Sequence, residues 1–254
     1  MAEAIINVEN LTVGFDRVTI LEDVSFSVQT GEIFIILGGS GCGKSTLMRH
    51  LIGLQEPKAG RVFINGKELT GADESQHQAI LSQIGVSFQG GALFGSMTIL
   101  ENVSLPLEEY TALPKQAIRW IAQSKLRLVG LVGCEDQLPA QLSGGMQKRA
   151  ALARAMALDP KILCLDEPSA GLDPITAVQL DELVLKLSEI LGITFVIVTH
   201  ELDSVFTLNG RVIMLDKQAK GIIAEGRPDA LKNDRSNEAA WRFFNRSLKT
   251  GTES

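Results

Sequence analysis

The sequence has few cysteines and lacks the leader typical of an exported chain. Its three cysteines, Cys42, Cys134 and Cys164, are odd in number and do not have the spacing of a metal site, so we expect no disulfide framework. Residues 1–4 open the chain without a basic and then apolar stretch. Both features favour folding in a reducing cytoplasm.

Long apolar runs and an excess of basic residues are also missing. Apolar runs such as 33–37 and 195–198 have the length of a strand and fall far short of the roughly 18 residues of a membrane span. A formal charge of -6 argues against a nucleic-acid surface, because binding phosphates in bulk requires a concentrated basic patch. We therefore expect neither a bilayer crossing nor a nucleic-acid partner, and we find no internal repeat.

The 254 residues are enough for one large domain, and local patterns predict an α/β fold. Helical spacing is expected from residue 46, over 150–157 and around 180–191, whereas 98–141 is rich in helix formers. Runs rich in β-branched residues predict strands over 5–8, 24–28, 33–36, 61–64, 85–88, 162–165 and 195–198. The alternation predicts a mostly parallel sheet with a helical insertion.

A P-loop pattern lies between the strand expected at 33–37 and the helix that follows. Glycines allow several backbone N–H groups to point at one phosphate, Lys44 would reach the β- and γ-phosphates, and the Ser45 hydroxyl would bind Mg²⁺. A chance match to this pattern in a chain of this length is about one in a hundred. The expected nucleotide-binding residues are Gly38, Gly39, Ser40, Gly41, Cys42, Gly43, Lys44, Ser45 and Thr46.

Cys42 is interpreted as a small filler within this loop rather than a redox switch. Its position at a helix start next to bound phosphate could nevertheless lower the pKa of its thiol. On that basis, alkylation of Cys42 is expected to block ATP binding.

The run 162–167 is an apolar strand that ends in two acids. Asp166 would hold Mg²⁺, directly or through water, and Glu167 would activate the attacking water as a general base. An acidic pair after a strand is more often an ordinary solvated strand end. Its place in the chain after a P-loop favours the catalytic interpretation.

A second anion-binding helix start is expected at Ser143, Gly144 and Gly145, because a basic, helix-forming run follows them. The alternative is that Ser143 is only a helix cap. One chain does not need two γ-phosphate sites far apart, unless the second completes the site of a partner subunit.

These motifs, in this order, resemble the ABC ATPase family over roughly residues 5–232, with 142–146 as the signature loop and 169–173 as the D-loop. The resemblance implies ATP and Mg²⁺, with Gln89 as the Q-loop residue that contacts both Mg²⁺ and the attacking water, and His200 as the switch histidine. Phe15 is similar to the aromatic residue that stacks on adenine. Met146 departs from the usual glutamine, which leaves the contacts of Ser143 intact.

The family implies a single ABC ATPase domain with a RecA-like core at about 1–90 and 150–232. Residues 91–149 would form the helical subdomain and 233–254 a C-terminal helical extension. It further implies a homodimer in which each signature loop closes over the P-loop of the other subunit, on a dimeric integral membrane permease.

Residues 89–98, followed by 101–103 and 106–107, resemble the ATPases of MCE-associated, Mla-type phospholipid transport, and 173–176 agrees. That resemblance implies a periplasmic MCE-domain lipid carrier, a small STAS-domain subunit and a peripheral position on the cytoplasmic face of the bacterial inner membrane. The tail carries Trp241, Phe244 and Leu248 at helical spacing. It would either fold back on its own core or stabilise the dimer.

Other functions remain open. An ATPase of a polar amino-acid importer shares every catalytic motif and differs only after Gln89. A soluble ABC ATPase of DNA repair or translation fits poorly, because a coiled-coil insertion or a tandem second ATPase domain is absent from the sequence. A P-loop kinase would lack the signature loop.

Overall fold

The computed structural model describes residues 4–15 and 18–246. One sheet is antiparallel, with the order β2-β1-β4-β5 among the described residues. Its strands extend well beyond the short runs predicted at 5–8 and 24–28, because polar residues alternate with apolar ones along both. They are β1 (Ala4–Phe15), β2 (Val18–Gln29), β4 (Ala59–Ile64) and β5 (Lys67–Glu68).

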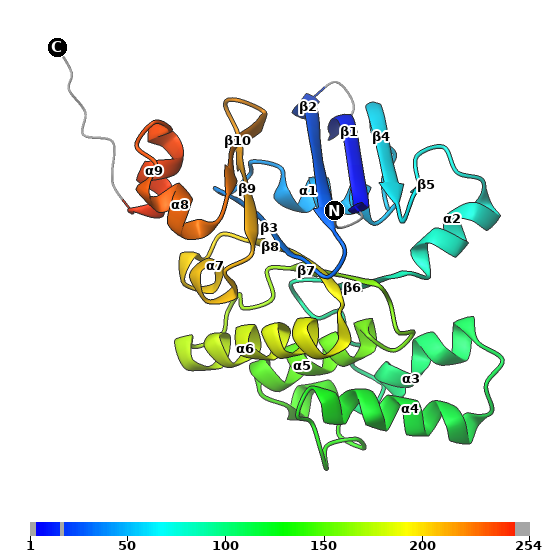
Figure 1. The fold of residues 1–254 in the computed structure, drawn as a ribbon. Helices are drawn as coiled ribbons and strands as arrows, with labels where there is room; N and C mark the ends of the chain where they lie inside the picture. The colour runs from blue at the N-terminus through cyan, green and yellow to red at the C-terminus, as the bar shows by residue number, and fades with distance from the viewer. Residues whose placement is uncertain (1–3, 16–17, 247–254) are drawn as a thin grey trace.

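The second sheet has the order β10-β9-β3-β8-β7-β6 in the part of the chain that the structure describes. Its strands run parallel except for β10, which pairs with β9 in the antiparallel sense. They are β3 (Ile33–Gly38), β6 (Ile84–Ser87), β7 (Ile162–Asp166), β8 (Thr194–Thr199), β9 (Arg211–Asp216) and β10 (Gly221–Gly226). The carboxyl ends of β3, β7 and β8 therefore meet at one edge (Figure 1).

Alternate residues of the parallel strands enter two different hydrophobic cores. Phe34 and Ile36 face a core between the two sheets, which also contains helix α1 (Lys44–Leu51). Ile35 and Leu37 face the opposite core, which is covered by α5 (Gly144–Ala155), α6 (Pro174–Leu191) and α7 (Leu202–Leu208). Burial on both faces explains why these strands appear in the sequence as continuous apolar runs.

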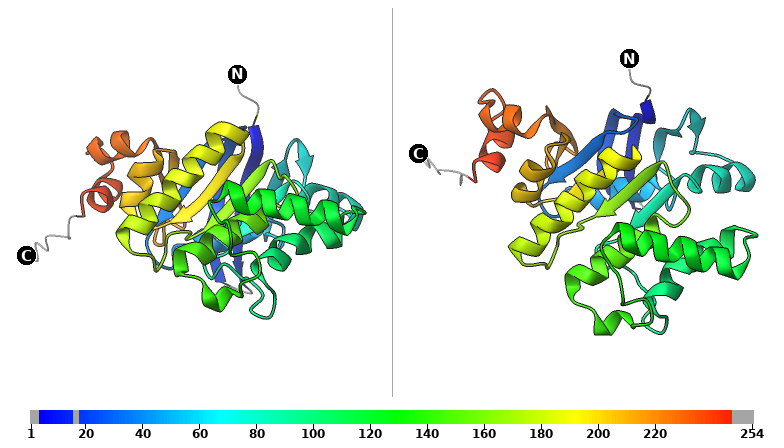
Figure 2. Two further views of the ribbon diagram at one scale, coloured as in Figure 1. Left: turned by 90° about the horizontal axis from the view of Figure 1, so that it is seen from below. Right: turned by 60° about the horizontal axis from the view of Figure 1, so that its bottom comes forward.

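A helical region packs beside the second core through α3 (Ile99–Tyr110) and α4 (Lys115–Leu128). A capping box starts α3, since Thr98 Oγ1 accepts from the Glu101 amide at 3.2 Å and Glu101 Oε2 accepts from the Thr98 amide at 2.7 Å. Figure 2 shows α3 and α4 on the side of the molecule opposite to α8 and α9. Helix α5 continues through the boundary predicted at 149/150, so the division into subdomains stays a prediction.

The described part of the C-terminal tail folds back on its own chain. It contains α8 (Pro228–Asn233) and α9 (Glu238–Phe244). Phe244 is 3% exposed, and its ring meets that of Phe206 edge-on with centroids 6.1 Å apart. Phe244 therefore follows the first of the two alternatives. Trp241 is half-buried with the Arg235 guanidinium over its ring, and Leu248 lies outside the described residues.

Several elements were not predicted, namely α2 (Glu74–Leu81) and the strands β5, β9 and β10, together with α7 and α8. Within α2 only Ile80 is buried, so the helix gives almost no apolar periodicity. Across the described ranges, no helix is both long and apolar enough to cross a membrane.

Candidate active site

The glycine-rich loop after β3 leads directly into helix α1. Gly43 is the N-cap of α1 and has φ of 103°, in the left-handed region. A Cβ at this position would lie 2.7 Å from Cγ2 of Ile20, so glycine is also required by the lack of space. Among the described residues no side chain caps α1, which leaves its first amide groups open to an anion.

Lys44 lies across the mouth of this loop. Its buried ammonium donates to the main-chain oxygens of Gly38 at 2.9 Å and Gly39 at 3.2 Å. It is also 4.0 Å from Oε1 of Glu167. A cation held only by carbonyl oxygens and one carboxylate can exchange these partners for phosphate oxygens.

Ser45 and Asp166 form a second pair at the same edge of the sheet. The Ser45 hydroxyl donates to Oδ1 of Asp166 at 3.1 Å. Burial raises the pKa of the Asp166 carboxyl above its usual value, although the hydrogen bond from Ser45 opposes this. A hydroxyl oxygen beside a carboxylate fits Mg²⁺, which commonly takes one or two protein ligands and completes its shell with phosphate and water. The described residues contain no cluster of three or more His, Cys, Asp or Glu suited to a metal.

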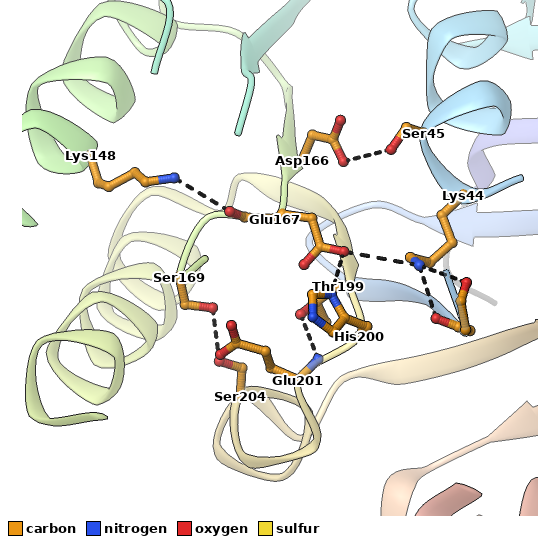
Figure 3. A network of polar contacts seen from close by, with 12 residues as sticks. Lys44, Ser45, Lys148, Asp166, Glu167, Ser169, Thr199, His200, Glu201 and Ser204 are labelled. Atoms are coloured by element: carbon orange, nitrogen blue, oxygen red, sulfur yellow. Dashed lines mark hydrogen bonds and ion pairs between the residues drawn. The ribbon is translucent and has the colours of Figure 1, made fainter. Parts of the chain in front are cut away.

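Glu167 follows β7, and its carboxylate points toward Lys44 and His200 (Figure 3). The residue is 8% exposed and has a left-handed φ of 49°. Its Oε1 lies 2.8 Å from Nδ1 of His200, which comes directly after β8. Its Oε2 is buried and has no hydrogen-bond partner among the described residues. A buried, unpartnered carboxylate oxygen can accept a proton from a bound water.

Gln89 occupies the loop after β6, and its side chain is exposed. Its main-chain oxygen accepts a hydrogen bond from Lys148 Nζ. Sequence reasoning missed Lys148, which appeared only as part of a basic run after the signature loop. No local pattern identifies it, because its partners are 59 and 19 residues away along the chain.

The signature loop lies in a different pocket from the P-loop. Ser143 is the N-cap of α5 and accepts from the Met146 amide at 3.3 Å. Ser143 and Gly145 line a cleft with Arg149 and Thr176, whereas Gly39 and Ser40 line a cleft with residues of α9. The structure therefore does not bring Ser143, Gly144 and Gly145 to the P-loop of their own chain.

Phe15 ends β1 opposite Val18 and is 44% exposed, so its ring is available at the surface. Within the P-loop, Gly39, Ser40 and Gly41 are exposed, whereas Thr46 is buried. These positions agree with backbone contacts from the loop and leave the role of each residue a prediction.

The burial of Cys42 agrees with its interpretation as a small filler, whereas the lowered pKa suggested for its thiol is wrong. Its side chain is 2% exposed and belongs to the core between the two sheets, with its sulfur directed at the space beside Gly38. Burial raises the pKa of this thiol, and the nearby Lys44 only partly opposes that effect. We therefore expect Cys42 to react slowly with alkylating reagents in the folded chain.

The fold and the order of these groups define a nucleotide-binding cassette, and the family comparison agrees. The model described as "ABC transporter" matches residues 21–170, which include the P-loop, Gln89, the signature loop and Glu167. The chain belongs to the ABC transporter family. Phe15 and His200 lie outside the matched range.

Three relatives are informative. The intermembrane phospholipid transport system ATP-binding protein MlaF of Haemophilus influenzae is 36% identical over 91% of this chain and 87% of its own length. MlaF of Escherichia coli K12 is 38% identical over 84% and 78%. The probable ribonucleotide transport ATP-binding protein mkl of Mycobacterium leprae is 41% identical over 83% of this chain, which spans 60% of the length of mkl.

Solved cassettes share the architecture. The ATP-binding cassette MJ0796, dimeric and bound to ADP and Pi in a post-hydrolysis state, has a TM-score of 0.79 at 32% identity, covering 87% of this chain and 98% of that one. The cbiO1 protein of Clostridium perfringens has a TM-score of 0.82 at 29% identity, covering 97% and 96%. The predicted α/β fold with a helical insertion and a C-terminal extension is confirmed.

Proposed function

We propose that this chain is the ATP-hydrolysing subunit of an ABC transporter and that it works with Mg²⁺. One observation carries the proposal: where β3, β7 and β8 end, Oε1 of Glu167 lies 4.0 Å from Lys44 Nζ and 2.8 Å from His200 Nδ1. An uncapped helix start, a buried lysine and an unpartnered carboxylate are the groups that phosphoryl transfer to water requires.

The roles follow from the position of each atom. The open amides of α1 and the Lys44 ammonium bind the β- and γ-phosphates, and Phe15 stacks on the adenine. Ser45, Asp166 and Gln89 would hold Mg²⁺, which neutralises negative charge on the phosphates when it is bound. A bound cation beside Asp166 would favour the ionised carboxylate and offset the cost of its burial.

Glu167 acts as the general base. Its free Oε2 takes the proton of the attacking water, while its Oε1 is held by His200 at 2.8 Å. The His200 side chain is 56% exposed. Donation from Nδ1 to Glu167 and from the other ring nitrogen to the γ-phosphate together would require the doubly protonated imidazolium form of His200. Hydrolysis thus depends on the chain holding Glu167 still.

We further propose that two copies form the complete enzyme. The signature loop and the P-loop of one chain lie in separate pockets, and the related cassette MJ0796 is dimeric. In a two-fold dimer, Ser143, Gly144 and Gly145 of one subunit would close over the nucleotide held by the other. ATP binding would then assemble the dimer, and hydrolysis would release it.

The cargo that we propose is phospholipid, moved between the inner and outer membranes. Support comes from the MlaF relatives, which are named for intermembrane phospholipid transport and match most of both chains. The ATPase would sit peripherally on the cytoplasmic face of the inner membrane. Its partners would be a permease dimer, an MCE-domain carrier and a STAS-domain subunit.

The test is mass spectrometry of the proteins that copurify with the tagged full chain from detergent-solubilised native membranes. Recovery of a permease with an MCE-domain protein is the expected result. A solute permease without any MCE protein would overturn the phospholipid assignment and leave the ATPase assignment in place. That second result would return the amino-acid importer to consideration.

A further inference from the structure

Helix α5 holds the loop that carries Gln89 through two basic side chains. Lys148 Nζ donates to the main-chain oxygen of Gln89. Six residues further along, Arg154 donates to the oxygens of Gly91 at 2.8 Å and Ala92 at 2.7 Å. Charge-assisted bonds to successive carbonyls fix the path of this loop relative to α5.

Lys148 differs from Arg154 in having a second target. Its Nζ also lies 3.5 Å from the main-chain oxygen of Glu167, as Figure 3 shows. One ammonium thus touches the backbone of two residues that the proposed mechanism uses, in the loops that follow β6 and β7. Both are contacted from a helix whose first residue follows Ser143.

The backbone of Glu167 needs such support. A left-handed φ of 49° in a residue with a long side chain costs roughly 1–3 kcal/mol and persists only when its surroundings hold it. The amide of Glu167 donates to Val198 at 2.8 Å, and its oxygen accepts from the Ala170 amide at 3.2 Å. Lys148 is the side chain that adds a third contact to this peptide, on its oxygen.

Electrostatics favour a cation at this place. Asp166, Glu167 and Glu201 all attract the ammonium of Lys148, although burial is the larger effect and lowers its pKa. A neutral side chain would lose that attraction, and a shorter one would lose its reach to both oxygens. Arginine would keep the charge and the length.

We propose that Lys148 is a positioning residue that fixes Glu167 and the Gln89 loop to the helix carrying the signature loop. The inference rests on the proposed hydrolysis of ATP. Because Lys148 lies on the helix that Ser143 caps, a displacement of the start of α5 would move Lys148 and with it the peptide of Glu167. A phosphate bound by the signature loop of one subunit would thereby affect the general base of that same subunit.

The experiment compares the full-length chain with Lys148→Met and Lys148→Arg. Lys186→Met, at an exposed lysine of α6, is the matched control. For each protein we would measure phosphate release, the Kd for MgATP and the melting temperature. We expect Lys148→Met to lower kcat roughly 10- to 100-fold with Kd within about twofold, because a small misplacement of a base is costly.

Rescue separates positioning from a merely structural role. Lys148→Arg should restore most of kcat, and Lys186→Met should leave all three quantities unchanged. If Lys148→Met fails to fold, Lys148→Gln takes its place, with the same expected loss of kcat. A near-normal kcat in Lys148→Met or Lys148→Gln would overturn the inference. So would a rise in Kd by the same factor as the fall in kcat.

The proposed function is judged separately in the same assay. Phosphate release by the unaltered chain, and its loss in Glu167→Gln, would support that function whatever the Lys148 variants do. Absence of phosphate release from the unaltered chain in the presence of Mg²⁺ would overturn the proposed function and the inference together.

Discussion

Helices α1 and α5 both begin at a glycine-rich loop, yet the two helix starts differ in their capping and in the charged groups around them. The start of α1 has no side-chain cap and is surrounded by Lys44, Asp166 and Glu167 of the same chain. The start of α5 is capped by its own Ser143, and its cleft contains none of these three groups. The first is a nearly complete site, whereas the second offers an anion a helix end and the nearby Arg149.

This difference explains why one chain would need a second copy. Ser143 Oγ holds the Met146 amide at 3.3 Å, a long hydrogen bond that a phosphate oxygen can replace. The α5 start therefore gains from a nucleotide that its own chain cannot deliver. The predictions below test that contrast.

Removing the base should have the largest effect. Glu167→Gln keeps the shape of the site and loses the proton acceptor, so kcat should fall roughly 10²- to 10⁴-fold while ATP still binds. Light scattering with saturating MgATP should then show a stable dimer. A variant that remains monomeric under these conditions would contradict the contrast between the two helix starts.

A mixing experiment places a damaged α1 start on one subunit and a damaged α5 start on the other. Lys44→Ala and Ser143→Arg should each be nearly inactive alone. Their mixed dimer contains one intact pairing of an α1 start with an α5 start, so mixing should restore up to about a quarter of normal phosphate release.

The control for mixing is a pair that cannot rebuild a site. Combining Lys44→Ala with the double variant Lys44→Ala/Ser143→Arg leaves every α1 start damaged, and activity should stay absent. Recovery in this control, or no recovery in the first mixture, would mean that the two starts do not complement each other across subunits.

Phe15→Ala tests the proposed adenine contact of the site at the start of α1. Loss of one stacking ring should weaken ATP binding by about 1–2 kcal/mol, or roughly tenfold in Kd, with little change in kcat. Titration with a fluorescent ATP analogue measures this effect. Phe15→Tyr should bind normally, and an unchanged Kd in the alanine variant would remove Phe15 from the site.

The smallest expected effect is on the free energy of unfolding, through polar residues that border the proposed site. Ser169, shortly after Glu167, meets the hydroxyl of Ser204 at 3.3 Å, and Ser204 in turn bonds Asp181 of α6. Burial raises the pKa of Asp181 to about 6, with Glu201 adding to the rise and Ser204 opposing it. The folded chain therefore keeps a proton that the unfolded chain releases near pH 4.

Because the folded pKa is the higher one, the contribution of Asp181 to stability is full below about pH 4 and is lost as the pH rises through about 6. Asp181→Asn should remove this loss and raise the free energy of unfolding at pH 7 by about 1–2 kcal/mol, allowing for partial solvation. Urea titrations at pH 4 and pH 7 measure it. Equal pH dependence in both proteins would exclude Asp181 as the cause.

The sequence predicted the buried strands of the parallel sheet well, because residues such as Phe195 and Ile197 are enclosed on both faces and leave continuous apolar runs. Strand β9 has the same signal in 212–215 and could have been found. Helix α2 could not be found from periodicity, because one buried residue, Ile80, leaves no pattern. Its Asp73 cap was the only local sign.

Residues whose chemistry follows from a local motif, such as Lys44 and Asp166, were predictable in position. Lys148 was not, since its role depends on α5 meeting two loops that are distant along the chain. The Cys42 thiol was misjudged because a helix start was visible in the sequence, whereas the burial of its side chain was not. A single sequence therefore does not show which of these side chains are buried or which distant residues they contact.

The left-handed backbone of Glu167 has a consequence for the evolution of this chain. Glycine would adopt φ of 49° without strain, so Glu167→Gly should relieve conformational energy at the very position where the base is required. Selection for thermal resistance alone would push position 167 away from glutamate. Random libraries screened only for heat tolerance should accordingly accumulate inactive proteins changed at this residue.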